Sequence, residues 1–324
     1  MAQPAILWTE EEWNQNVVRF VSEKFSDQDR VTQIRIMELM ASSIVVGQIL
    51  GNDFMQREVL RRRQSEYDSI ECPEWDRPLE FQRKMRTESR MKLVGILYSG
   101  TPEDQCRLQS LSYCLGPVFS CPGFESKAKE MRDNDGLKFG RIFYELKTAC
   151  LFRANGVGLK FLAAKGTKAC EFSVNEEYFI ECKQPEGEVT SETPLISSFS
   201  NYLEDMLGKV PEGKKGILFV WIPSMRRLDR QTKRHIELSL ARAYKKVESS
   251  SPEIWDVVGA TVIVGQFFRE IEESGISTTS MEYQIIAPCF EGTEYPLFPV
   301  EVKRAINIVP SLPFRMRWIL DPFA

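Results

Sequence analysis

The stretch from Gly136 to Gln184 most constrains the fold, because it contains four segments of regular structure joined by short connections. Its first segment, Leu137 to Arg153, has apolar residues at helical spacing and ends before Asn155-Gly156, a typical helix stop. Three β-rich runs follow it, at Val157 to Ala163, Ala169 to Val174 and Tyr178 to Lys183. This pattern predicts a helix followed by three strands.

Acidic side chains occur in this stretch at positions where apolar ones are expected. Glu145 lies on the apolar stripe of the predicted helix, where an ionised carboxylate needs a cation or a hydrogen-bond donor. Alternation along the third strand directs Glu181 and Lys183 to the same face. Glu171 belongs to the preceding strand of a predicted hairpin, so its carboxylate can converge with that of Glu181.

Three carboxylates and a lysine suit the hydrolysis of a phosphodiester bond. Mg²⁺ prefers oxygen ligands and is commonly held by one or two carboxylates together with water and substrate phosphate. A bound divalent ion lowers the pKa of a water molecule and stabilises negative charge at the phosphorus. A lysine beside the ion can orient that water or offset charge in the transition state.

These residues resemble the motifs of the PD-(D/E)XK nuclease superfamily over roughly Leu137 to Pro223. The segment FYELKTACLFRANG resembles the first helix and its acid, KACEFSV the second motif, and YFIECKQ the third. The residues at the family's catalytic and supporting positions are Glu145, Glu171, Glu181, Lys183 and Gln184. The sequence departs from the family at Cys170-Glu171, where other members have Pro-Asp.

The resemblance implies an α/β (α+β) fold with a restriction-endonuclease-like mixed sheet flanked by helices, preceded by a mainly helical N-terminal region. It also implies that Mg²⁺ or Mn²⁺ is the cofactor, held by Glu145, Glu171 and Glu181. Lys183 would support the attacking water, and Gln184 would have a supporting role. The expected activity is therefore metal-dependent hydrolysis of DNA.

A structural interpretation of the same residues stays open, because Glu-x-Lys recurs elsewhere, for example at Glu125–Lys127. In that interpretation Glu181 and Lys183 lie on a solvated strand edge. Glu145 then forms a salt bridge to a nearby basic residue of its own helix, either Lys147 or Arg141.

The chain after this stretch predicts a crossover and a further strand. Leu195 to Leu207 has apolar residues spaced for burial on one side of a helix. Gly216 to Pro223, GILFVWIP, is nearly continuous in apolar residues, as expected for an interior strand. Asp256 to Gly265, DVVGATVIVG, predicts another strand.

The segment from Arg226 to Lys246 is strongly basic, with few acidic residues and a narrow apolar stripe. Such a helix can contact DNA phosphates, and an ordinary basic surface helix has the same pattern. The candidate nucleic-acid-binding residues are Arg226, Arg227, Arg230, Lys233 and Arg234.

Composition excludes several other classes of chemistry. The net charge of −4 argues against a protein that coats nucleic acid by charge alone. One histidine and eight cysteines without a CxxC pair disfavour a structural zinc site, and the single histidine disfavours a Ser-His or Cys-His hydrolase. Without a secretory signal or a long apolar run, the cysteines are expected to be reduced thiols of a cytoplasmic protein that does not enter a membrane.

Three regions are expected: a mainly helical region at 1–130, the nuclease-like core at 131–290, and a C-terminal extension at 291–324 that packs on the core. Apolar residues repeat at helical spacing from Trp8 to Leu50, with Asp27 expected to cap the second helix. The first region could bind a protein partner or orient DNA. A homodimer would suit an enzyme that cuts both strands of a duplex.

Two functions follow from the sequence. The first is a Mg²⁺-dependent nuclease acting on DNA. The second is a catalytically inactive protein of the same fold that binds nucleic acid or serves as a scaffold, which the departure at Cys170-Glu171 favours. No glycine-rich phosphate loop is present to indicate an ATPase or a dinucleotide enzyme.

Overall fold

The structure is a computed structural model that describes residues 17–51, 102–133, 136–154, 156–162, 169–185, 192–223, 228–273 and 276–286. The chain divides into two compact units. Unit 1 comprises residues 1–120, 128–143 and 312–324, and unit 2 comprises residues 121–127 and 144–311. No helix within the described ranges is both long and apolar enough to cross a membrane.

Unit 1 is helical throughout its described part. It contains α2 (Arg19–Lys24), α3 (Arg30–Leu50), α6 (Pro102–Val118), most of α7 (Phe124–Asp133) and the beginning of α8 (Gly136–Ala154). The residue that caps α3 is Asp29, whose carboxylate accepts a 2.9 Å hydrogen bond from the backbone N–H of Thr32. The prediction that Asp27 caps this helix was therefore wrong by two residues.

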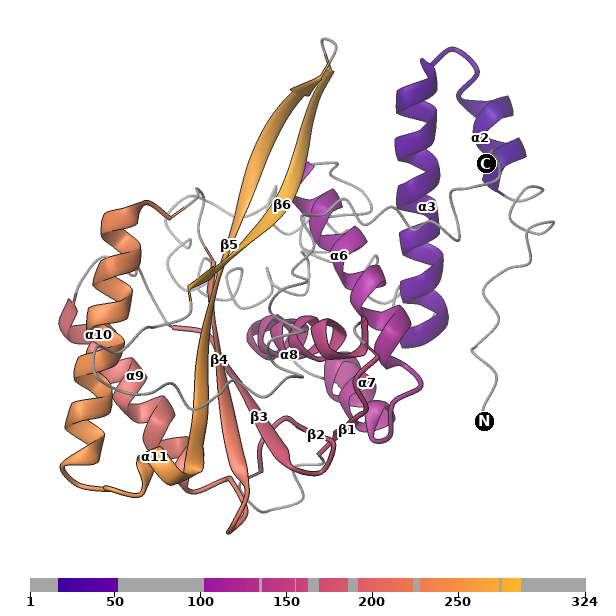
Figure 1. The fold of residues 1–324 in the computed structure, drawn as a ribbon. Coiled ribbons are helices and arrows are strands. Elements are labelled where there is room, and N and C mark those ends of the chain that lie inside the picture. Colours follow the sequence, from indigo (N-terminus) through magenta and orange to yellow (C-terminus); the bar gives the residue numbers. More distant parts are fainter. Residues whose placement is uncertain are drawn as a thin grey trace, which may run out of the picture. The chain divides into compact units, whose positions relative to one another are not determined.

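Unit 2 is built on a mixed sheet that has six strands within the described residues, in the order β1-β2-β3-β4-β5-β6 (Figure 1). The strands are β1 (Leu159–Phe161), β2 (Phe172–Val174), β3 (Tyr178–Lys183), β4 (Lys215–Pro223), β5 (Val258–Glu273) and β6 (Ile276–Ile286). β3, β4 and β5 are parallel to one another, and the remaining neighbours are antiparallel. The prediction of an α/β protein with a mixed sheet and helices is confirmed.

Local sequence signals explain the start of this sheet. α8 ends in a Schellman motif, because Gly156 has a φ of 75° and its N–H and that of Val157 bond to the carbonyls of Arg153 and Phe152. The β2–β3 hairpin then turns through Asn175 and Glu176, both in the left-handed region. These two turns place β1, β2 and β3 in succession after the helix, as the sequence predicts.

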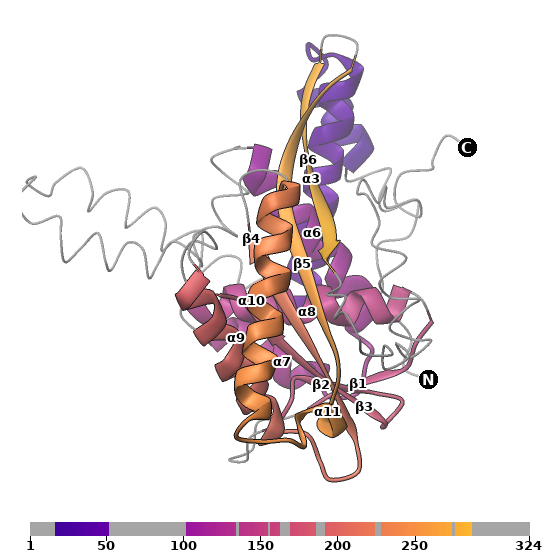
Figure 2. The same cartoon turned by 60° about the vertical axis from the view of Figure 1, so that its left-hand side comes forward.

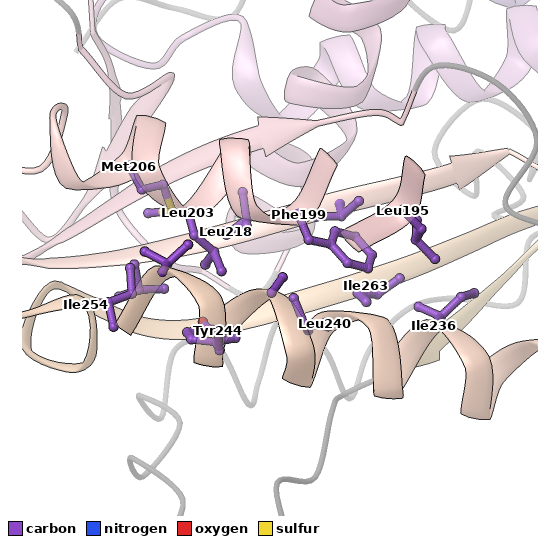
Figure 3. Close-up of a cluster of buried hydrophobic side chains, with 14 of the residues drawn as sticks. Leu195, Phe199, Leu203, Met206, Leu218, Ile236, Leu240, Tyr244, Ile254 and Ile263 are labelled. Carbon is purple, nitrogen blue, oxygen red and sulfur yellow. The ribbon is translucent and has the colours of Figure 1, made fainter. Parts of the chain in front are cut away.

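Helices cover β4 on both faces, which explains its continuous apolar sequence. Leu218 and Val220 belong to a buried cluster with side chains of α9 (Glu192–Leu207) and α10 (Arg230–Glu248), shown in Figure 3. On the opposite face, Phe219 stacks edge-on against Phe152 of α8, with ring centroids 5.9 Å apart. The sheet therefore lies between α8 on one side and α9 and α10 on the other.

The second half of unit 2 extends the sheet beyond β4. The short helix α11 (Ile254–Val257) leads into β5, which pairs with β4 as far as Gln266 and with β6 from Ile263 to Glu273. Figure 2 shows α10 lying along β4 and β5, and the β5–β6 hairpin continuing past the end of β4. The predicted C-terminal extension at 291–324 lies outside the described residues.

Candidate active site

Glu145 of α8 is buried and pairs with a lysine from another helix. Lys127 of α7 donates a 2.6 Å hydrogen bond to Glu145 Oε2 and another of 2.6 Å to Glu171 Oε2. Lys127 and Glu145 are both only 6% exposed. The expected link between Glu145 and Glu171 is therefore present, and a buried cation joins the two carboxylates.

Backbone pairing fixes the position of Glu171 immediately before β2. Its N–H donates to the carbonyl of Ile180 at 2.9 Å, and its carbonyl accepts from the N–H of Leu162 at 3.0 Å. Phe172 lies opposite Ile180 in the β2–β3 ladder, and the N–H of Glu171 bonds to the carbonyl of that same Ile180, which precedes Glu181 in the sequence. The two glutamates are near enough for the charge of Glu171 to raise the pKa of Glu181, in line with the predicted convergence across a hairpin.

Glu181 and Lys183 project from the same face of β3, as alternation predicts. Lys183 Nζ lies 2.7 Å from Glu181 Oε1, and the Glu181 side chain is fully buried. β3 is an interior strand with β2 and β4 on either side. The interpretation that placed these residues on a solvated strand edge is therefore wrong.

Two residues of the α9 region complete a ring of ion pairs with Glu181 and Lys183. Lys183 Nζ also lies 2.7 Å from Asp205 Oδ2. Lys209 Nζ lies 2.7 Å from Glu181 Oε1 and 2.9 Å from Asp205 Oδ2. Both lysines contact the same Glu181 oxygen, whereas Glu181 Oε2 is buried without a hydrogen-bond partner.

Burial and mutual repulsion perturb the acidic groups. Burial raises the pKa of Glu145 to about 8, the charge of Glu171 adds to this effect, and Lys127 opposes it. Burial also raises the pKa of Glu181, again with a contribution from Glu171 and opposition from Lys183. Burial would raise the pKa of Asp205 too, but its hydrogen bonds to Lys183 and Lys209 outweigh burial and lower it.

The lysines respond in the opposite sense. Burial by itself lowers the pKa of Lys127, but Glu145 and Glu171 outweigh burial and raise it. Lys183 likewise has a raised pKa, because Glu181 and Asp205 outweigh its desolvation. The pKa of Lys209 is raised as well, so Lys127, Lys183 and Lys209 all remain protonated at neutral pH.

Glu171 connects the two halves of this cluster electrostatically, since its charge raises the pKa of both Glu145 and Glu181. Within the described part of the chain the cluster contains four carboxylates and three lysines, which leaves one negative charge in excess when all are ionised. This excess is present above the raised pKa of Glu145, about 8, and at lower pH a further cation could bind by displacing the Glu145 proton.

The carboxylate oxygens of this cluster are suitable ligands for a hard divalent ion. Carboxylate oxygens are the ligands that Mg²⁺ and Mn²⁺ prefer, and Glu181 Oε2 is a buried oxygen free to serve as one. In the conformation observed, lysines bridge the carboxylates, and no group of three or more His, Cys, Asp or Glu within the described ranges has the geometry to hold a metal. Metal binding by Glu145 and Glu171 would require Lys127 to move.

Three members of the cluster were not among the residues selected from the sequence: Lys127, Asp205 and Lys209. Lys127 belongs to the Glu125–Lys127 copy of the Glu-x-Lys pattern, which alone does not indicate a site. Asp205 and Lys209 have helical i, i+4 spacing, which a sequence contains for many surface pairs. The cation paired with Glu145 is thus Lys127, and not a neighbour on α8 as the structural interpretation expected.

The other predicted site residues are only partly described. Arg230 and Arg234 are exposed on α10 and Lys233 is half-buried, whereas Arg226 and Arg227 lie outside the described residues. The Gln184 backbone carbonyl accepts a 3.1 Å hydrogen bond from the Tyr202 hydroxyl. The assignment of the basic residues to DNA contacts stays a prediction.

Comparisons with protein-family models, with curated proteins and with solved structures each found no match to this chain. A functional proposal therefore depends on the chemistry of the cluster and on the arrangement of the elements that carry it.

Proposed function

We propose that this protein is a metal-dependent nuclease that hydrolyses phosphodiester bonds of DNA, with a PD-(D/E)XK-type site on a restriction-endonuclease-like core. The observation that carries the proposal is that Glu181 and Lys183, 2.7 Å apart on one strand, lie in one cluster with the buried carboxylate of Glu145 and the partly buried carboxylate of Glu171. Buried like charges are costly, so their accumulation at one place favours a functional explanation.

The order of elements supports the same proposal. α8, β1, β2, β3, α9 and β4 follow one another as the helix, three strands, helix and strand of the superfamily core do. Their pairing is antiparallel for the first three strands and parallel between β3 and β4. Glu145 lies on α8 and Glu181 on β3, and Glu171 immediately precedes β2, which supports the order of acids that the resemblance implies.

Each side chain has a role in this mechanism. Glu145, Glu171 and Glu181 would hold Mg²⁺ or Mn²⁺, which supplies an acidified water and stabilises negative charge on the phosphate. Lys183 keeps its proton next to Glu181 and can donate hydrogen bonds to the attacking water or to a phosphate oxygen. The exposed arginines of α10, Arg230 and Arg234, would contact the DNA backbone.

The test compares DNA cleavage by the wild type with that by Glu181→Gln and Lys183→Met, on plasmid and oligonucleotide substrates in Mg²⁺ or Mn²⁺. We expect metal-dependent cutting that each change reduces by roughly 10²-fold or more. Glu177→Gln and Lys214→Met remove equal charges at exposed positions of the same unit and should cut like the wild type. Equal cutting by all five proteins would reject the proposal.

A catalytically inactive scaffold is the second candidate, and Lys127 is the observation that favours it. A cation already bridges Glu145 and Glu171, as a structural ion-pair network requires. Calorimetry with Mn²⁺ separates the two candidates. The nuclease requires binding that Glu181→Gln weakens, whereas the scaffold predicts no carboxylate-dependent binding at all.

A further inference from the structure

The ion pairs around Lys183 form a closed ring of four side chains from β3 and the end of α9. Going around the ring, Lys183 contacts Glu181, Glu181 contacts Lys209, Lys209 contacts Asp205, and Asp205 contacts Lys183. All four distances lie between 2.7 and 2.9 Å. Opposite charges alternate, so every member has an attractive neighbour on both sides.

The ring fixes Lys183 more firmly than Glu181 alone would. A lysine ammonium has three donors on a flexible stem, and one acceptor leaves the stem considerable freedom. Here Glu181 Oε1 and Asp205 Oδ2 hold the Lys183 ammonium from two directions, each at 2.7 Å. The Lys183 side chain is still 23% exposed, so water or a substrate oxygen can reach it.

The same ring orients the Glu181 carboxylate. Lys183 and Lys209 both bind Oε1, which leaves Oε2 as the oxygen without a partner. Without Lys209, Oε1 would keep only one of its two cations and the carboxylate could rotate to share its oxygens differently. Lys209 and Lys183 together therefore favour the orientation that leaves Oε2 of Glu181 open to another ligand.

Packing makes α9 a rigid support for this arrangement. Phe199, Leu203 and Met206 are fully buried in the cluster that joins α9 to β4 and α10. Asp205 lies next to Met206 in the sequence, and Lys209 follows one helical turn after Asp205. The two charged residues are consequently held at a constant position relative to β3.

We infer that Asp205 and Lys209 are positioning residues of the proposed active site: Asp205 orients the ammonium of Lys183, and Lys209 orients the carboxylate of Glu181. This inference rests on the proposed nuclease function. Neither residue needs to touch the substrate, because each acts through its neighbour in the ring.

The kinetic test uses Asp205→Asn and Lys209→Met, with Glu204→Gln and Lys214→Met as controls. Glu204 and Lys214 are exposed residues of the same unit, so the controls remove the same charges without opening the ring. We expect the ring variants to lower kcat roughly 10- to 100-fold, as is usual when a residue that supports a catalytic group is removed, with little change in KM. Lys209→Arg should recover part of the kcat because it restores a cation next to Glu181.

A second measurement works without catalysis. The lysine ammonium resonances of the metal-free protein, followed by NMR, should show a slowly exchanging signal that Lys183→Met removes. Asp205→Asn and Lys209→Met should abolish or broaden this signal, whereas Glu204→Gln should leave it unchanged. Thermal unfolding of each variant identifies any that fails to fold, and Lys209→Met tests the ring if Asp205→Asn is one of these.

The outcomes separate the two proposals. A wild type that does not cut DNA, combined with a Lys183 signal that Asp205→Asn abolishes, would reject the nuclease and retain the positioning of Lys183. Folded ring variants with wild-type kcat and an unchanged Lys183 signal would overturn the positioning and leave the nuclease standing. If Asp205→Asn and Lys209→Met lowered kcat no more than Glu204→Gln and Lys214→Met do, the positioning role would also be overturned.

Discussion

Lys127 and Glu145 lie 2.6 Å apart at a place where both side chains are more than nine-tenths buried. Replacing Lys127 by Met should lower the free energy of unfolding of the metal-free protein by about 1–3 kcal/mol, because it leaves Glu171 without its cation and buried Glu145 without its hydrogen-bond donor. The control is Lys129→Met on the same helix, where the side chain is exposed. Urea unfolding at neutral pH measures the difference, and equal stability of the two variants would contradict the prediction.

The same variant should bind Mn²⁺ more tightly than the wild type does. Lys127 occupies the space between Glu145 and Glu171, so it competes with any ion for the same oxygens. Titration calorimetry of Lys127→Met, of Lys129→Met and of the wild type tests this competition. Weaker binding by Lys127→Met would show that the lysine assists the metal and does not oppose it.

Stability should fall as pH rises from about 4.5 to about 8, and Glu145 should contribute to the fall together with Glu181, whose pKa is also raised. The pKa of Glu145 is raised by burial to about 8 from an ordinary value of 4.5. Between these values the folded state retains a proton that the unfolded state has released, so higher pH favours unfolding, by up to about 1.4 kcal/mol per pH unit. Urea unfolding from pH 5 to pH 8 should show this slope, and Glu145→Gln should reduce it to the contribution of Glu181 while Glu177→Gln retains it in full.

Metal binding near neutral pH should release a proton. A carboxylate must be ionised to bind a divalent ion, and the raised pKa of Glu145 means that this group is largely protonated at pH 7. Calorimetry with Mn²⁺ in two buffers of different protonation enthalpy measures the released protons directly. Release by the wild type and none by Glu145→Gln is expected, and identical release by both would exclude Glu145 as its source.

DNA binding should depend on the N-terminal half of α10. Arg230→Gln combined with Arg234→Gln should weaken binding to any DNA sequence and reduce the slope of log affinity against log salt by about one for each phosphate that is no longer bound. Lys245→Gln combined with Lys246→Gln removes the same charge from exposed positions at the other end of the helix. A similar effect of the two double variants would indicate general charge attraction and no defined contact.

Local patterns in the sequence predicted the framework of the candidate site well. The apolar stripe and the Asn155-Gly156 stop gave α8, and period-two alternation gave the bounds of β3 and the shared face of Glu181 and Lys183. These features depend on a few consecutive residues, so a single sequence contains them. β1 and β2 are shorter than predicted, with three residues each, because the ladder between them pairs only those residues.

The charged partners could not be predicted, because they depend on how separate elements pack together. Lys127 meets Glu145 and Glu171 only after α7, α8 and the start of β2 have assembled. Asp205 reaches Lys183 only after α9 has packed against the sheet. An acidic residue on an apolar stripe indicates that some cation is required, but its spacing does not indicate which one.

Lys127 also determines where the protein can be shortened. Lys127 lies within residues 121–127, which belong to the same compact unit as Glu145 and Glu171. In the sequence, however, Lys127 precedes α8 and all strands of the sheet. A fragment that starts at residue 131 would contain every acid of the candidate site and lack the lysine that neutralises two of them. Fragments intended to carry the site should therefore begin before Cys121.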